Sequence, residues 1–164
     1  MDLEKQYSEG YADNNGVQIF YHDHGPADGE PILLVHGLGA QLVHWPEHLI
    51  DFLKEHNYRP ITYDNRDVGL SSRFAGEPAF VLDYVKYFLR LPLKSEYTID
   101  DMAEDGIKLL DSLGIKKAHI LGTSMGGMIA QIISSQYSER VKSLTLIAST
   151  ASTPSPLNAP TSEV

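Results

Sequence analysis

Hydrophobic positions change spacing several times along the chain, and these changes predict strands and helices in alternation. Residues 31–35 form a short continuous apolar run, typical of a strand covered on both faces of a parallel sheet, and residues 118–121 are a further predicted strand. Residues 46–56 instead carry apolar side chains at helical spacing. The pattern therefore predicts an α/β protein with a mostly parallel sheet and helices on both of its faces.

The same spacing rules predict the remaining elements. Residues 10–12 and 17–21 flank Asn14-Asn15-Gly16, a turn signal that predicts a hairpin. Thr98 is a suitable N-cap and Gly114 a suitable C-terminal residue for one helix. The other predicted elements are strands over 60–63 and 143–148 and helices over 80–91 and 125–137.

Composition narrows the class of protein. The chain has 22 acidic and 13 basic residues and a net charge of -9, so we expect neither nucleic acid nor an anionic membrane surface as a partner. It contains no cysteine, which excludes disulfides and thiolate metal sites and fits a cytoplasmic location. No apolar run is long enough to span a membrane. Since dinucleotide, phosphate-loop and metal-ligand spacings are also absent, we expect no cofactor and no metal.

The segment 122–126 reads Gly-Thr-Ser-Met-Gly and joins a predicted strand to a predicted helix. This Gly-x-Ser-x-Gly pattern, in that context, is typical of a nucleophile elbow. Side chains at Gly122 or Gly126 would collide at so sharp a turn, whose strain holds the serine hydroxyl clear of the sheet. We expect Ser124 to be a nucleophile and the Met125 amide, at a helix N-terminus, to face a developing oxyanion.

A second glycine motif, His36-Gly37-Leu38-Gly39, follows the strand over 31–35. An oxyanion hole takes its second backbone donor from a loop of this kind, and the Leu38 N–H is the candidate. The motif also fits an ordinary glycine turn at the end of a strand. We expect His36 to orient the turn and not to transfer protons.

Two further residues are candidates for the substrate pocket. Arg66 lies in the polar segment 64–71, for which a hydrogen-bonded loop is a simpler explanation than substrate contact. Trp45 fits pocket lining and core packing equally well. The apolar stripe of the helix over 80–91 is better explained by packing on the sheet than by a place at the pocket entrance.

The three motifs in this order resemble the α/β-hydrolase superfamily over residues 11–148. Segments 63–71 and 122–128 are most similar to bacterial esterases of the aclacinomycin methylesterase type. Asp67 stands where many of those relatives have glycine. The resemblance implies an α/β-hydrolase fold and hydrolysis of a small-molecule ester through an acyl-enzyme, without a cofactor. It also implies that Ser124 attacks the carbonyl and that the Leu38 and Met125 amides hold the oxyanion.

In this fold a carboxylate and then a histidine follow the serine in the chain. The only carboxylates after Ser124 are Glu139 and Glu163, and all seven histidines precede it: His22, His24, His36, His44, His48, His56 and His119. We therefore expect a sheet truncated after its sixth strand. On this interpretation residues 1–148 are the N-terminal part of the core, and residues 149–164 begin a cap or linker. The C-terminal part of the core is absent and could be supplied by a complementary fragment.

Two alternatives stay open at this point. The chain could be a non-catalytic binding or scaffold module that kept the elbow and lost the acid and the base. The same scaffold could also perform C–C bond hydrolysis, lyase chemistry or perhydrolysis.

Overall fold

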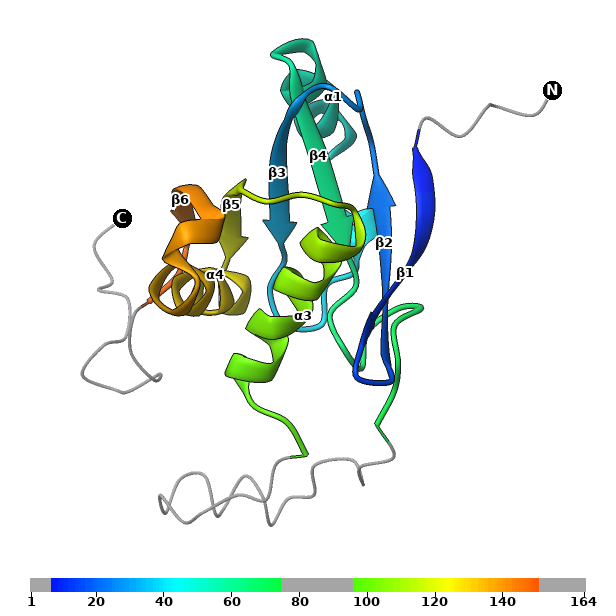
Figure 1. The fold of residues 1–164 in the computed structure, drawn as a ribbon, viewed down its shortest axis with the longest axis vertical. Helices are drawn as coiled ribbons and strands as arrows, with labels where there is room; N and C mark the ends of the chain where they lie inside the picture. The colour runs from blue at the N-terminus through cyan, green and yellow to red at the C-terminus, as the bar shows by residue number, and fades with distance from the viewer. Residues whose placement is uncertain (1–6, 75–95, 151–164) are drawn as a thin grey trace, which may run out of the picture.

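The computed structural model describes residues 7–74 and 96–150. Six strands form one sheet in the order β1-β2-β4-β3-β5-β6, shown in Figure 1. The strands are β1 (Ser8–Asn14), β2 (Val17–Asp23), β3 (Glu30–Val35), β4 (Tyr58–Tyr63), β5 (Ala118–Thr123) and β6 (Val141–Ile147). The helices are η1 (Leu42–His44), α1 (Glu47–Glu55), α3 (Ile99–Ser112), α4 (Met125–Gln136) and η2 (Ser138–Arg140).

Strand direction follows the predicted pattern. The hairpin β1–β2 is antiparallel and β2 pairs antiparallel with β4, whereas β3 is parallel to both β4 and β5, and β5 is parallel to β6. The turn at residues 14–16 joins β1 to β2 as predicted. The mostly parallel sheet and the α/β-hydrolase type of fold are therefore confirmed. The helix predicted over 80–91 lies outside the described residues.

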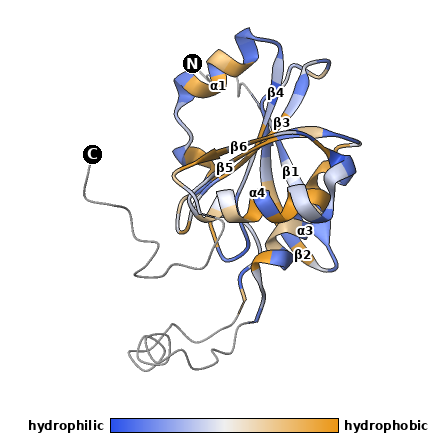
Figure 2. Cartoon of the chain, turned by 90° about the vertical axis from the view of Figure 1, so that its left-hand side faces the viewer, coloured by the Kyte–Doolittle hydropathy of each residue, from blue (hydrophilic) through white to orange (hydrophobic). Residues whose placement is uncertain are grey.

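Side chains of β3 alternate between two apolar layers, as they must on a strand covered on both faces. Leu33 packs in the larger cluster, which includes residues of α3 and α4. Ile32 and Leu34 pack in a smaller cluster with Ile50 and Leu53 of α1. Figure 2 shows this apolar character concentrated in β5, β6 and much of α4.

Helix α3 begins and ends at the predicted residues. The Thr98 Oγ1 accepts a hydrogen bond from the Asp101 N–H at 3.3 Å, and the Asp101 carboxylate accepts one from the Thr98 N–H at 2.6 Å. This reciprocal capping box satisfies two backbone donors that the helix itself leaves free. After the helix, Gly114 adopts a φ of 68°, the left-handed conformation that glycine favours.

Strand β6 lies at one edge of the sheet and pairs only with β5 within the described part of the chain. Its apolar side chains Leu144, Leu146 and Ile147 are 36%, 42% and 47% exposed. The sequence of β6 is typical of a buried central strand, and these residues are exposed because its second edge has no neighbour among the described strands. The division of the chain at residue 148 stays a prediction.

Candidate active site

Ser124 occupies the turn between β5 and α4 and is exposed to solvent. Its backbone angles, φ 52° and ψ -122°, are strained for a residue with a side chain. The Ser124 hydroxyl makes no capping hydrogen bond to α4. Such an arrangement leaves the Oγ accessible at the carboxyl end of β5, which is the geometry expected of a nucleophile elbow.

The neighbouring glycines are required by close backbone approaches. A Cβ on Gly122 would lie less than 3.0 Å from the Gly126 carbonyl oxygen. A Cβ on Gly126 would lie less than 3.0 Å from the carbonyl oxygens of Val35 and His36. Any larger residue at either position would therefore force the first turn of α4 away from β3 and β5.

The glycine turn after β3 lies directly against Ser124. A Cβ on Gly37 would lie 3.1 Å from the Ser124 Cβ and 3.6 Å from its Oγ. The turn is closed by a hydrogen bond of 3.3 Å from the Ala40 N–H to the Gly37 carbonyl, and Gly39 adopts a φ of 73°. The Leu38 side chain points to solvent and is 83% exposed.

Two residues next to the serine carry the backbone N–H groups predicted for an oxyanion hole. They are Leu38, in the turn after β3, and Met125, the first residue of α4. Neither donates a backbone hydrogen bond to another described residue. Their assignment as oxyanion donors stays a prediction, with a geometry that permits it.

His36 is buried beside this turn. Its Nδ1 lies 3.1 Å from the Gly37 carbonyl oxygen, and the Asn65 amide donates to the His36 carbonyl at 3.4 Å. Burial lowers the pKa of the His36 imidazole below its ordinary value, which favours the neutral ring. These contacts agree with an orienting role for His36.

The loop after β4 is tied to the loop after β3 by one buried carboxylate. Asp64 accepts hydrogen bonds from the Leu42 N–H at 2.8 Å and from the Leu70 N–H at 3.0 Å. The Ser71 hydroxyl donates to the Asp64 carbonyl oxygen at 2.6 Å. The segment 64–71 is thus a hydrogen-bonded loop that supports the edge of the sheet carrying Ser124.

Arg66 makes internal contacts. Its guanidinium donates to Asp105 of α3 through Nε at 2.7 Å and Nη2 at 2.8 Å, and Asp105 also accepts from the Asn14 amide at 2.8 Å. The Phe74 and Tyr97 rings lie 5.4 and 5.1 Å from the Arg66 guanidinium carbon. A substrate contact by Arg66 stays a prediction, and the contacts in the structure join the β4 loop to α3.

Sequence reasoning missed Asp105 as the partner of Arg66. The available signal was a carboxylate on the apolar face of a helix, between Met102 and Ile107, both of which are buried. A charge in such a position usually has a partner of opposite sign. The sequence could not show which cation that is, because Arg66 lies 39 positions away.

Two other residues have a clear place in the structure. Asp67 adopts a φ of 66°, a conformation that glycine reaches more readily than other residues, and its Oδ1 accepts a hydrogen bond of 2.6 Å from the Phe74 N–H. Trp45 is half-buried against the small cluster around Ile32 and Ile50. Core packing thus accounts for Trp45, and its place in a substrate pocket stays a prediction.

The described residues contain neither a group of three or more His, Cys, Asp or Glu side chains that could hold a metal ion nor a helix long and apolar enough to cross a membrane. Within the same residues the Ser124 hydroxyl has no hydrogen-bond partner. The candidate site therefore consists of the elbow, the glycine turn and the loop that supports them.

Comparison with known proteins shows which family the chain resembles. The family model described as "alpha/beta hydrolase fold" matches residues 30–163. The putative carbamate hydrolase RutD of Variovorax paradoxus is 34% identical over 131 residues, 80% of this chain and 42% of that protein. The rhodomycin D methylesterase DnrP of Streptomyces peucetius is 31% identical over 136 residues, 82% of this chain and 40% of that protein.

Solved structures show the same similarity in space. A hydrolase from Pseudomonas aeruginosa superposes with a TM-score of 0.71 at 26% identity, over 92% of this chain and 49% of its own. The chain spans less than half the length of each of these relatives.

Proposed function

The chain belongs to the α/β-hydrolase family, and from that premise we propose that it carries the nucleophile and oxyanion hole of a serine hydrolase that cleaves carboxylic esters. One observation carries the proposal. Ser124 is exposed in a strained backbone conformation at a strand-to-helix turn, with Gly37 of the neighbouring loop packed against its side chain. A structural serine has no need of such strain.

The proposed reaction has two steps. The Ser124 Oγ bonds to the ester carbonyl carbon while its proton passes to a general base, and the Leu38 and Met125 N–H groups stabilise the negative charge on the carbonyl oxygen. The ester C–O bond then breaks, and the alkoxide leaves as an alcohol with that proton. Water attacks the acyl-enzyme in the same way, releasing the acid and restoring Ser124.

The general base and the acid that orients it are proposed to come from polypeptide outside this chain. Every histidine of the chain precedes Ser124, whereas the fold places the catalytic histidine after the nucleophile. Residues 1–148 would then be the N-terminal part of the core and residues 149–164 the start of a cap or linker. A complementary C-terminal part would complete the site, and the isolated chain would be nearly inactive.

The proposed substrate is a small-molecule ester, and no cofactor is proposed. The names of the two relatives, a methylesterase and a putative carbamate hydrolase, both indicate attack at a carbonyl carbon bonded to oxygen. The cysteine-free sequence supports a cytoplasmic location as part of the same proposal.

A fluorophosphonate probe tests the nucleophile. We expect rapid labelling of Ser124 in the protein translated from the complete reading frame, and labelling slower by about three orders of magnitude in the 164-residue chain, because the base is missing. Ser124→Ala should abolish labelling in both. Rapid labelling of the short chain that is lost in Ser124→Ala would contradict the inference that this chain lacks the general base.

The same experiment distinguishes the alternatives. If the longer protein contains an acid and a histidine after Ser124 and the probe still does not label Ser124, the result would favour a non-catalytic module. Labelling without hydrolysis of aryl and methyl esters would favour C–C hydrolysis, lyase chemistry or perhydrolysis on this scaffold.

A further inference from the structure

The end of β6 and the segment that follows it lie against the elbow and form hydrogen bonds with the backbone of Ser124. The Ser124 N–H donates to the carbonyl oxygen of Ile147, the last residue of β6, at 3.0 Å. The Ser124 carbonyl oxygen accepts a hydrogen bond of 2.8 Å from the Ser149 hydroxyl and one of 2.9 Å from the Gly127 N–H. Two of these three hydrogen bonds come from residues at the end of β6.

Local backbone geometry brings Ser149 to this position. Ala148 adopts a φ of 48°, so the chain bends sharply as β6 ends. A Cβ on Gly127 would lie less than 3.0 Å from the Ser149 Cβ and Oγ, so the glycine provides the space that Ser149 fills. The atoms nearest to such a Cβ belong to the Ser149 side chain.

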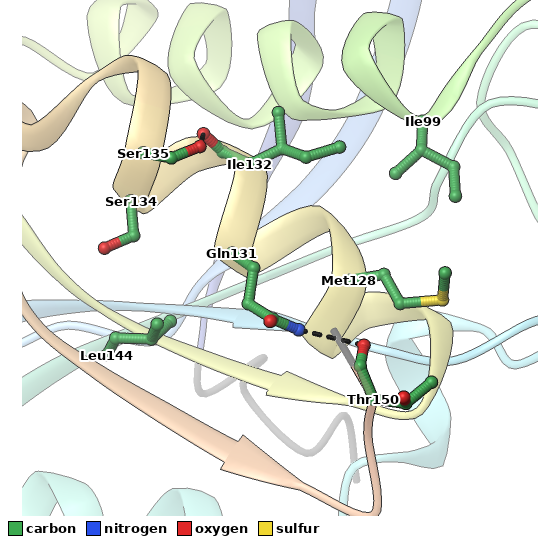
Figure 3. Close-up of a pocket in the computed structure, with 8 residues that line it drawn as sticks. All are labelled: Ile99, Met128, Gln131, Ile132, Ser134, Ser135, Leu144 and Thr150. Atoms are coloured by element: carbon green, nitrogen blue, oxygen red, sulfur yellow. Dashed lines mark hydrogen bonds between the residues drawn. The ribbon is translucent and has the colours of Figure 1, made fainter. Parts of the chain in front are cut away.

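A second contact holds the same segment. The Gln131 Nε2 donates to the Thr150 carbonyl oxygen at 3.1 Å and to the Gly127 carbonyl oxygen at 3.1 Å. Figure 3 shows the Gln131 side chain reaching from α4 to Thr150. Residues 148–150 are thus fixed on α4 on both sides of Gly127.

The chemical consequence follows from which peptide group Ser149 contacts. The Ser124 carbonyl and the Met125 N–H belong to one planar peptide unit. A hydrogen bond to the carbonyl therefore fixes the direction of the N–H, and it also polarises the unit so that the N–H becomes a stronger donor. We propose that Ser149 is a positioning residue that orients the Met125 N–H toward the oxyanion of the reaction.

This inference rests on the proposed function, since the oxyanion belongs to that reaction, but its test needs neither the base nor an ester. The chain has no cysteine, so Ser124→Cys introduces a single thiol at the elbow. A thiol at a helix N-terminus ionises more readily when an N–H donor faces it. Ultraviolet absorbance of the thiolate against pH gives its pKa, and iodoacetamide gives its reactivity.

We expect Ser149→Ala, added to Ser124→Cys, to raise the pKa of the introduced thiol and to slow its alkylation about threefold near neutral pH. Ser149→Thr, which keeps the hydroxyl, should restore both values. Ser135→Ala is the matched control, because the Ser135 hydroxyl lies on the same helix and donates only to the nearby Ile132 carbonyl. Circular dichroism melting separates these effects from a loss of fold.

A folded Ser149→Ala variant with an unchanged thiol pKa would overturn the inference, even if its melting temperature falls. If Ser149→Ala does not fold, Gln131→Ala provides a second test, because it loosens the same segment from its other side. We expect Gln131→Ala to raise the thiol pKa by a smaller amount. An unchanged thiol pKa in Gln131→Ala would also overturn the inference. The two proposals fail separately. An unlabelled Ser124 in the longer protein contradicts the proposed function, whereas a thiol insensitive to both variants contradicts the role of Ser149.

Discussion

Backbone strain marks individual residues of the candidate site. Within the described part of the chain five non-glycine residues have positive φ angles: Asn15, Asn57, Asp67, Ser124 and Ala148. Asparagine and aspartate tolerate this conformation well, but serine and alanine do so rarely. The two residues without that tolerance, Ser124 and Ala148, lie at the elbow and in the segment that holds it. Strain is therefore greatest where the proposed chemistry requires a fixed geometry.

Buried charge is the second feature at this scale, and it gives a prediction for Asp105. Asparagine at this position would leave the buried Arg66 guanidinium without its compensating charge. We expect Asp105→Asn to lower the free energy of unfolding by about 3 kcal/mol, measured by urea denaturation. The control is Asp111→Asn, because the Asp111–Arg140 pair is much more exposed and should contribute less than about 1 kcal/mol. Equal losses in the two variants would contradict a special role for the buried pair.

His24 makes stability depend on pH. Burial, with smaller contributions from His22 and Lys54, lowers the pKa of His24 from 6.5 to about 4. Between these pH values the unfolded chain binds a proton that the folded chain does not, so the free energy of unfolding decreases as the pH falls. His24→Gln should flatten the profile in this window, as measured by urea denaturation at several pH values. The control is His48→Gln, a change at an exposed histidine of α1, which should not alter the pH dependence of the free energy of unfolding.

Among the described elements, β6 stands apart because one of its edges has no partner strand in that part of the chain and its apolar side chains are exposed. An edge of this kind is a template for pairing with another strand. One face of β5 and β6 is covered by α4, as in the interior of a protein. In the described structure, β6 thus has the apolar sequence of an interior strand but lies at the edge of the sheet.

This arrangement predicts association through β6. We expect the 164-residue chain to form larger species as its concentration rises, as measured by light scattering after size exclusion. Leu146→Lys, a charge on the edge strand, should reduce this association several-fold. Leu70→Lys is the matched control, because Leu70 is even more exposed but lies in a loop. If both variants reduce association equally, general apolar exposure and not the strand edge is responsible.

At the scale of the whole molecule, the sequence predicted what depends on local pattern. The hairpin followed from the turn at residues 14–16, and the elbow from the spacing of Gly122 and Gly126 around Ser124. Contacts between distant segments were not predictable, because hydrophobic spacing carries no information on partners. The Arg66–Asp105 pair and the Ser149 hydrogen bond to Ser124 are both of this kind. The second also requires the bend at Ala148, which no residue type there signals.

The exposed side chain of Ser124 has a consequence for how such a protein can evolve. Its hydroxyl contributes no hydrogen bond to the fold among the described residues, whereas a Cβ on Gly122 or Gly126 would meet backbone atoms at less than 3.0 Å. A substitution of Ser124 is therefore expected to remove the proposed chemistry and to leave the architecture intact, while a substitution at either glycine disturbs the architecture itself. On the proposed function, the same scaffold can thus acquire a different nucleophile in a single substitution.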